Sequence, residues 1–485
     1  MANDPNIKMK ELDQLTARFA QQGKLLEAVD AAQQSATLAK DTYGENSGAY
    51  GNRIIGLGLL YKRIRAYDKA EPLLRQAVEV WKKIDMGEGS LHRIYIASLN
   101  DLAALYQELR AYDKAEPLLK EIVEIQRNLN EKHPDYATSL YNLAALYSEM
   151  RAYDKAEALL LQAMEVRKKA LGDKHPDYAT SLNSLAWLYH EQSEYDKAIT
   201  LYQQAIEIRK TVLGEEHPDY ASSLNNLAFL YLDLGIYYKA EPLLLQAMEV
   251  RKKALGDKHP IYATSLNNLG GLYQSLKAYD KAEPLFRQAM EIQKKTLGET
   301  HSVYVKSLEN LGGLYRSMQA YNKAEPLLKQ AVEIQRKTLG EYHPDYANSL
   351  KSLAFLYQSM GAYDKAETLY RQALEIHKKS LGEDHPDYAS SLSNLAGLYK
   401  ERKWYDKAEP LYRQAIEIRK KALGEKHPKY ITSLENLAIL YYLMGSKDKA
   451  EPLINQICEL ELRQVSEVWE KILTKDHTEW LDKSQ

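Results

Sequence analysis

The fold is decided by a stretch that begins His217-Pro-Asp-Tyr-Ala-Ser-Ser-Leu-Asn-Asn-Leu-Ala-Phe-Leu-Tyr231 and ends Leu243-Leu-Leu-Gln-Ala-Met-Glu-Val-Arg-Lys-Lys253. Both segments carry apolar residues at the spacing of a helix face. Pro and Asp behind the histidine suit a helix start, where unpaired N–H groups and the helix dipole favour both residues. The Leu213-Gly214 pair ahead of it supplies the glycine expected after the end of a preceding helix. The stretch therefore predicts two antiparallel helices joined by short turns.

This pair recurs along nearly the whole chain of 485 residues. A string close to Tyr-Asp-Lys-Ala-Glu lies between the two segments of each copy. Its alanine stands at residues 28, 70, 115, 156, 198, 240, 282, 324, 366, 408 and 450, so copies lie 42, 45, 41 and then seven times 42 residues apart. Such a period predicts a repeat architecture in which each unit packs mainly against its neighbours.

The repeated unit resembles the tetratricopeptide repeat. Asn226-Leu-Ala-Phe-Leu-Tyr231, followed by Ala240, Leu244 and Ala247, places the leucine, small residue, tyrosine and later residues of that motif at matching offsets. The 42-residue period resembles the kinesin-light-chain-like type, which is also common in bacterial proteins, so a bacterial source is expected. The match covers roughly residues 9 to 460. The resemblance implies an all-α fold: a right-handed α-solenoid, or superhelix, of about 11 helix-turn-helix units. The first helix of each unit would line a concave groove.

The ends of the array depart from the repeat. We expect a degenerate first unit or cap at 1–40, ten regular units at 41–460, and a C-terminal capping helix or tail at 461–485. Docking of the tail onto a missing domain or a partner is the alternative. Residues 84–92 replace the usual linker and are interpreted as a flexible loop.

Composition narrows the classes of function. The 65 Lys and Arg residues nearly balance the 67 Asp and Glu residues, which removes the simplest argument for a nucleic-acid or anionic-membrane partner. Cys458 is the single cysteine, so an internal disulfide framework is excluded. Without a signal peptide or a long apolar run, the chain is expected to be soluble and cytoplasmic.

Tyrosine is strongly over-represented among the aromatic residues, with 37 Tyr against 4 Phe and 5 Trp. About three fall in each unit, as Tyr220, Tyr231 and Tyr237 do. Each lies near a helix end, where the ring can pack between helices while the hydroxyl reaches a polar group. The excess is therefore interpreted as interhelix packing.

The sequence offers no catalytic constellation. Eight histidines share one interhelix turn in successive units, on the order of 10 Å apart, whereas metal ligands lie at about 2 Å. They are interpreted as turn and cap residues: His133, His175, His217, His259, His301, His343, His385 and His427. Phosphate-loop, nucleophile-elbow and metalloprotease motifs are missing. We therefore expect no enzyme activity, no catalytic residues, no cofactor and no metal.

Candidate binding residues are the groove positions of the first helix in each unit. The position before Leu-Ala, or Leu-Gly, supplies Asn142, Asn226, Asn268, Asn310, Asn394 and Asn436, and the position before that one supplies Asn183, Asn225, Asn267 and Lys351. In tetratricopeptide grooves a similar asparagine ladder holds the backbone of an extended peptide. Asparagine suits this because it offers both a donor and an acceptor. Alternatively, these residues bond only to neighbouring turns.

The position after Leu-Ala, or Leu-Gly, gives the groove its shape. Gly271 and Gly313 are expected to leave a depression between aromatic walls, to which Trp187, Phe229 and Phe355 contribute. Close helix packing at the glycines is the alternative. Arg316 and Lys351 add positive charge in the middle of the array, while an acidic row precedes it: Glu108, Glu149, Glu191 and Asp233.

These features predict a non-catalytic scaffold that binds an extended peptide or a segment of another protein in its groove. The alternative is a regulatory or adaptor subunit, or a sensor module, of a larger effector assembly, such as a caspase-like protease or a defence complex. A helical-repeat RNA-binding protein is disfavoured by the pI of about 6.7 and by the acidic row. No membrane partner is expected, and a homo-oligomer formed through the terminal repeats stays open.

Overall fold

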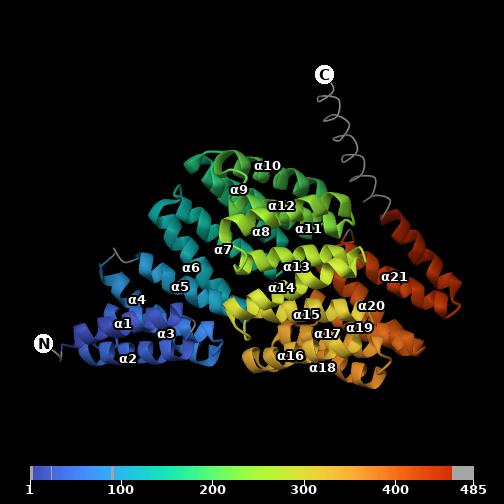
Figure 1. Cartoon of the computed structure of the whole chain (residues 1–485). Helices are drawn as coiled ribbons and strands as arrows, with labels where there is room; N and C mark the ends of the chain where they lie inside the picture. The colour runs from blue at the N-terminus through green and yellow to red at the C-terminus, as the bar shows by residue number, and fades with distance from the viewer. Residues whose placement is uncertain (1–3, 23, 89–91, 426, 461–485) are drawn as a thin grey trace. The chain divides into compact units, whose positions relative to one another are not determined.

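The computed structural model describes residues 4–22, 24–88, 92–425 and 427–460, which form helices joined by short turns, with no strand among them (Figure 1). The bounds are α1 (Pro5–Gln21), α2 (Leu25–Tyr43), α3 (Gly48–Arg63), α4 (Tyr67–Glu88), α5 (His92–Glu108), α6 (Tyr112–Asn130), α7 (Pro134–Glu149), α8 (Tyr153–Leu171), α9 (Pro176–Glu191), α10 (Tyr195–Leu213), α11 (Pro218–Asp233), α12 (Tyr237–Leu255), α13 (Pro260–Ser275), α14 (Tyr279–Leu297), α15 (Ser302–Ser317), α16 (Tyr321–Leu339), α17 (Pro344–Ser359), α18 (Tyr363–Leu381), α19 (Pro386–Glu401), α20 (Tyr405–Leu423) and α21 (Pro428–Leu443). Residues 447–460 are also helical.

The helices alternate between two roles. We call the odd-numbered ones from α3 onward A helices and the even-numbered ones B helices. The A helices α3, α5, α9, α11, α13, α15, α17 and α19 each pack against the B helix that follows in the same repeat, and α11, α13, α15, α17 and α19 also contact the next A helix or the one before it. The predicted all-α solenoid of repeated helix-turn-helix units is therefore confirmed.

The chain divides into two compact units, Met1–Ala170 and Leu171–Gln485, which we call the first and second units. The first unit holds α1 to α7 and nearly all of α8, and the second unit holds α9 to α21. In the second unit consecutive helices lie side by side (Figure 1). The expected boundaries at residues 40 and 460 stay a prediction.

Histidine caps the start of eight A helices. The Nδ1 atom of His217 accepts a hydrogen bond from the backbone N–H of Asp219 at 3.1 Å, and Pro218 occupies the first helical position. This is the role of an N-cap side chain, which satisfies an N–H group that has no partner inside the helix. The same bond recurs at the other seven turns, so the interpretation of these histidines as cap residues is confirmed.

The core explains why the aromatic residue is tyrosine. From α13 onward, the tyrosine near the end of each A helix donates its hydroxyl to a glutamate of the preceding B helix. The bond from Tyr315 to Glu283 measures 2.8 Å, and that from Tyr357 to Glu325 measures 3.0 Å. Partner and donor are 32 residues apart in every such pair from α13 onward. Phenylalanine could fill the space but could not make this bond.

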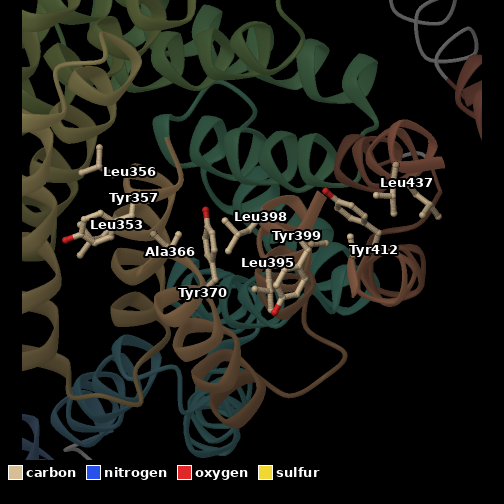
Figure 2. Packing of buried hydrophobic residues seen from close by; sticks show 14 of the residues in the cluster. Leu353, Leu356, Tyr357, Ala366, Tyr370, Leu395, Leu398, Tyr399, Tyr412 and Leu437 are labelled. Atoms are coloured by element: carbon tan, nitrogen blue, oxygen red, sulfur yellow. The ribbon is translucent and has the colours of Figure 1, made fainter. Parts of the chain in front are cut away.

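A buried cluster runs through the later repeats of the second unit. Figure 2 shows Tyr370 and Tyr412 reaching from their B helices into the space beside Leu395, Leu398 and Leu437. Both tyrosines are buried, at 2% and 1% exposure. In each of these repeats, the B-helix tyrosine therefore fills the gap between successive A helices.

Two expectations about irregular segments have different outcomes. The loop interpretation is wrong for residues 84–88, because α4 continues through Glu88. The missing Leu-Gly signal explains this, since nothing in the sequence ends the helix at its usual place. Residues 89–91 and the tail at 461–485 lie outside the described residues. Within the described ranges, no helix combines the length and the apolar character that a membrane crossing requires.

Candidate functional site

A groove of about 1310 Å³ runs along the second unit. Six successive A helices contribute to its lining: α11, α13, α15, α17, α19 and α21. Because the repeats stack in register, equivalent positions of neighbouring A helices form continuous rows along the groove. A surface of this shape suits an elongated ligand better than a compact one.

The groove brings together nine of the sixteen residues predicted from the sequence. These are Phe229, Asn267, Asn268, Gly271, Asn310, Lys351, Phe355, Asn394 and Asn436. Six others belong to the second unit but not to the lining: Asn183, Trp187, Asn225, Asn226, Gly313 and Arg316. Asn142 belongs to the first unit. Contact of any of them with a partner stays a prediction.

Several of the asparagines join neighbouring repeats. The Nδ2 atom of Asn183 donates to Ser223 Oγ at 2.8 Å, and that of Asn268 donates to Asn225 Oδ1 at 2.7 Å. Asn183 and Asn225 are buried, at 6% and 8% exposure. These amide groups therefore bond to an adjacent repeat, and not to neighbouring turns of their own helices. In the first unit Asn142 makes a long contact of this kind, 3.5 Å to Asn100 Oδ1.

In each of the glycine pairs 270–271 and 312–313, one glycine allows close helix packing and the other faces open space. A Cβ atom built on Gly271 or Gly313 would have no neighbour within 4 Å, so these positions face open space. One on Gly270 would lie 3.0 Å from the ring of Phe286, and one on Gly312 would lie 2.8 Å from Leu328. Close helix packing therefore belongs to the first glycine of each pair and open space to the second, and of the two second glycines only Gly271 lines the groove.

Aromatic side chains stand out of the A helices at the position that Gly271 and Gly313 occupy in their own repeats. Trp187, Phe229 and Phe355 are 42%, 40% and 45% exposed, which is unusual for large apolar rings. Arg316 covers one face of Phe355, with its guanidinium carbon 3.7 Å from the ring centroid. Such a stacked pair keeps the ring in place while leaving its other face to a ligand.

Charged groups also lie in the groove, in poorly solvated positions. Glu309 accepts a hydrogen bond of 2.7 Å from Ser349 Oγ and lies 3.9 Å from Lys306 Nζ. Burial nevertheless raises the pKa of the Glu309 carboxyl above its usual value. Burial likewise lowers the pKa of the Lys351 ammonium. Both groups lower the stability of the fold when charged, as groups held for binding often do.

Removing either charge is expected to stabilise the protein, with opposite pH dependence. Because the folded state binds more protons at Glu309, its contribution to stability is lost as pH rises above 4.5, so the gain from Glu309→Gln grows from acid to neutral pH. The lowered pKa of Lys351 has the opposite sign. The gain from Lys351→Met is largest at neutral pH and disappears as pH rises toward 10.5.

Urea unfolding of the full chain across this pH range checks both signs. Glu216→Gln serves as the matched control, because Glu216 is exposed in a turn of the second unit. A gain from Glu309→Gln that does not change with pH would contradict the explanation by burial.

Residues of the B helices also line the groove, and the sequence reasoning missed them. Phe286, Gln293, Gln335, Tyr370 and Tyr412 reach it between the A helices. A signal for two of them exists in the sequence: the position occupied by Arg209 and Arg251 changes to glutamine at Gln293 and Gln335. The groove positions of the A helices alone could not reveal it.

The fold and the groove define a class of protein, the helical-repeat scaffold for protein interaction. The described ranges contain no group of three or more His, Cys, Asp or Glu side chains that could hold a metal ion. The model of the family described as Tetratricopeptide repeat matches residues 18–83, 95–169, 149–211, 192–246, 219–295, 303–379, 350–421 and 387–460. The chain therefore belongs to the tetratricopeptide repeat family, and its repeats are of the kinesin-light-chain-like kind, as the sequence predicts.

Three solved structures similar to this chain are as follows. A Podosopora anserina protein with nearly identical TPR-like repeats of the kinesin light chain kind is 32% identical over 42% of this chain and 98% of its own, with a TM-score of 0.38. BtubC (BKLC) from P. vanneervenii is 26% identical over 47% and 93%, with a TM-score of 0.41. A Rap protein complexed with competence and sporulation factor is 17% identical over 77% and 98%, with a TM-score of 0.52, and shares the fold. A comparison with curated proteins found no match. The expected bacterial source stays a prediction.

Proposed function

We propose that the second unit binds an extended segment of another protein along its groove and acts without catalysis, in the cytoplasm. The observation that carries this proposal is that six successive A helices line one groove. An elongated ligand could contact all six at once.

The lining has the two kinds of groups that peptide recognition needs. Asn310 and Asn394 place carboxamides along the groove, where each offers a donor and an acceptor to the backbone of a ligand of any sequence. Phe229 and Phe355 provide apolar contact area near either side of the Gly271 depression. Interfaces of this composition concentrate their affinity in a few aromatic contacts surrounded by polar groups.

Selection of random linear peptides on the full chain tests the proposal. Phe229→Ala is expected to weaken the selected peptides about tenfold, since loss of one aromatic contact of this kind costs more than about 1 kcal/mol. Leu245→Ala is the matched control: this side chain is 39% exposed on the B helix α12, and Phe229 is 40% exposed. Peptides that bind equally well to both variants would contradict binding in the groove.

A further inference from the structure

A buried polar position recurs at intervals of 42 residues in the B helices α10 to α20 of the second unit. It is arginine in α10, α12 and α20, but it differs in the three helices between them. In order the residues are Arg209, Arg251, Gln293, Gln335, His377 and Arg419, and none is more than 7% exposed. Two of the residues that replace arginine, Gln293 and Gln335, line the middle of the groove.

Where this position is arginine, its guanidinium group forms hydrogen bonds that connect neighbouring repeats. In α10, Arg209 donates to Ser223 Oγ at 2.9 Å and to the carbonyl oxygen of Asp219 at 2.8 Å. It also donates to Thr180 Oγ1 at 2.9 Å. Arg251 repeats the pattern with Ser265 and Ser222. The donors at the end of each side chain thus find acceptors on two A helices.

The glutamine side chain at this position is shorter than arginine and makes fewer hydrogen bonds to the neighbouring A helices. Asn267 Nδ2 donates to Ser307 Oγ at 2.7 Å, and Ser307 in turn donates to Gln293 Oε1. Two atoms of this chain of groups, Asn267 Oδ1 and Gln293 Nε2, are buried and have no hydrogen-bond partner in the described structure. Both residues line the groove, and one helical turn from Asn267 stands Gly271, which faces open space. In the arginine copies the buried atoms without a partner are the Nε–H of each arginine and, at the position of Asn267, Asn183 Oδ1 and Ser393 Oγ. Of these residues only Ser393 lines the groove, and no glutamine stands beside it.

We propose that Asn267, Ser307 and Gln293 form a subsite for the side-chain carboxamide of an asparagine or glutamine in the bound segment. This inference rests on the proposed binding of a peptide in the groove. The ligand N–H would donate to Asn267 Oδ1 and its carbonyl oxygen would accept from Gln293 Nε2. Buried polar groups are almost always paired, so such a ligand would satisfy both remaining atoms at once.

The chemistry of the subsite selects a carboxamide over other groups. A carboxylate could accept from Gln293 but would place a second acceptor against Asn267 Oδ1, and an ammonium would place a donor against Gln293 Nε2. Gln293 is completely buried on its B helix, so the backbone of a ligand would not reach it. We expect the backbone to lie nearer the solvent, beside Asn268 and Asn310. Only a side chain that passes Gly271 would reach Gln293.

The test uses peptides selected from a random linear library on the full chain. We expect asparagine or glutamine to be enriched at one peptide position. Changing that residue to the matching acid should weaken binding roughly tenfold, the usual effect of leaving buried polar groups unpaired. Gln293→Arg should abolish the preference for the amide over the acid. The arginine should fold in place, because Ser307, Val303 and Thr264 stand where Ser223, Asp219 and Thr180 serve Arg209.

Two further variants keep the test decisive. Asn267→Ser introduces the residue that α19 carries at the same position, Ser393, and should also abolish the preference. His377→Arg makes the same kind of change two repeats further on, at a residue outside the groove lining. This variant should leave the preference for the amide intact. Peptides that depend on Phe229 but show no amide preference would overturn the subsite alone. Peptides that are insensitive to Phe229 would overturn the groove proposal as well.

Discussion

Gly271→Trp is expected to weaken groove-selected peptides at least about 100-fold, equivalent to about 2.7 kcal/mol and the size of a binding hot spot. The indole would occupy the depression that Gly271 leaves open and would close the approach to Gln293. The fold should accept it, because Trp187 occupies the equivalent position of α9 and is 42% exposed there. Replacing a glycine inside a helix should even add a little stability.

Peptide titration by fluorescence anisotropy measures this effect, and thermal unfolding checks the fold. Gly56→Trp is the matched control, because Gly56 is also a helical glycine with open space around it but lies in the first unit. Equal binding by the two variants would show that the depression is not part of the ligand site.

Tyr370→Ala is expected to lower the free energy of unfolding of the second unit by about 3–5 kcal/mol, as loss of a buried aromatic ring usually does. Figure 2 shows the ring among the leucines of the core, where its exposure is 2%. Its hydroxyl donates to Gln358 Oε1 at 2.9 Å, and Gln358 donates to Glu401 Oε1 at 2.7 Å. The variant therefore leaves a cavity, and it also removes a hydrogen bond to Gln358, which pairs with Glu401 in the lining of the groove.

Urea unfolding followed by circular dichroism measures the loss, with two variants for comparison. Tyr370→Phe keeps the ring and should cost only about 1 kcal/mol, for the hydroxyl bond. Tyr342→Ala removes an exposed tyrosine, 71% accessible in a turn of the same unit, and should change stability by less than about 0.5 kcal/mol. A loss from Tyr370→Ala no larger than that from Tyr342→Ala would contradict this account of the core.

The fold was predictable because most repeats carry the same local signals. The histidine cap recurs at the start of eight A helices, usually with a proline behind it, and the helical apolar spacing repeats at the same period. The prediction was wrong at residues 84–88, where Met86 stands in place of the glycine that follows most of the other B helices.

The candidate site was predictable only in part. The sequence indicates which helix of each unit faces the groove, so positions such as Asn268 and Phe229 could be named. It does not show how far an asparagine reaches, and Asn183 and Asn225 turn out to be buried against neighbouring groups. The change from arginine to Gln293 is visible in the sequence of the B helices, but only the structure shows that this B-helix position reaches the groove between the A helices.

The tyrosine–glutamate bonds have a consequence for how such a chain can change in length. Their partners are always 32 residues apart, and the glutamine–tyrosine bonds of the same repeats are always 26 apart. Gain or loss of one whole 42-residue module would therefore preserve every one of these offsets. The number of modules, and with it the length of ligand that the protein can hold, is free to vary by duplication and deletion without any redesign of the core.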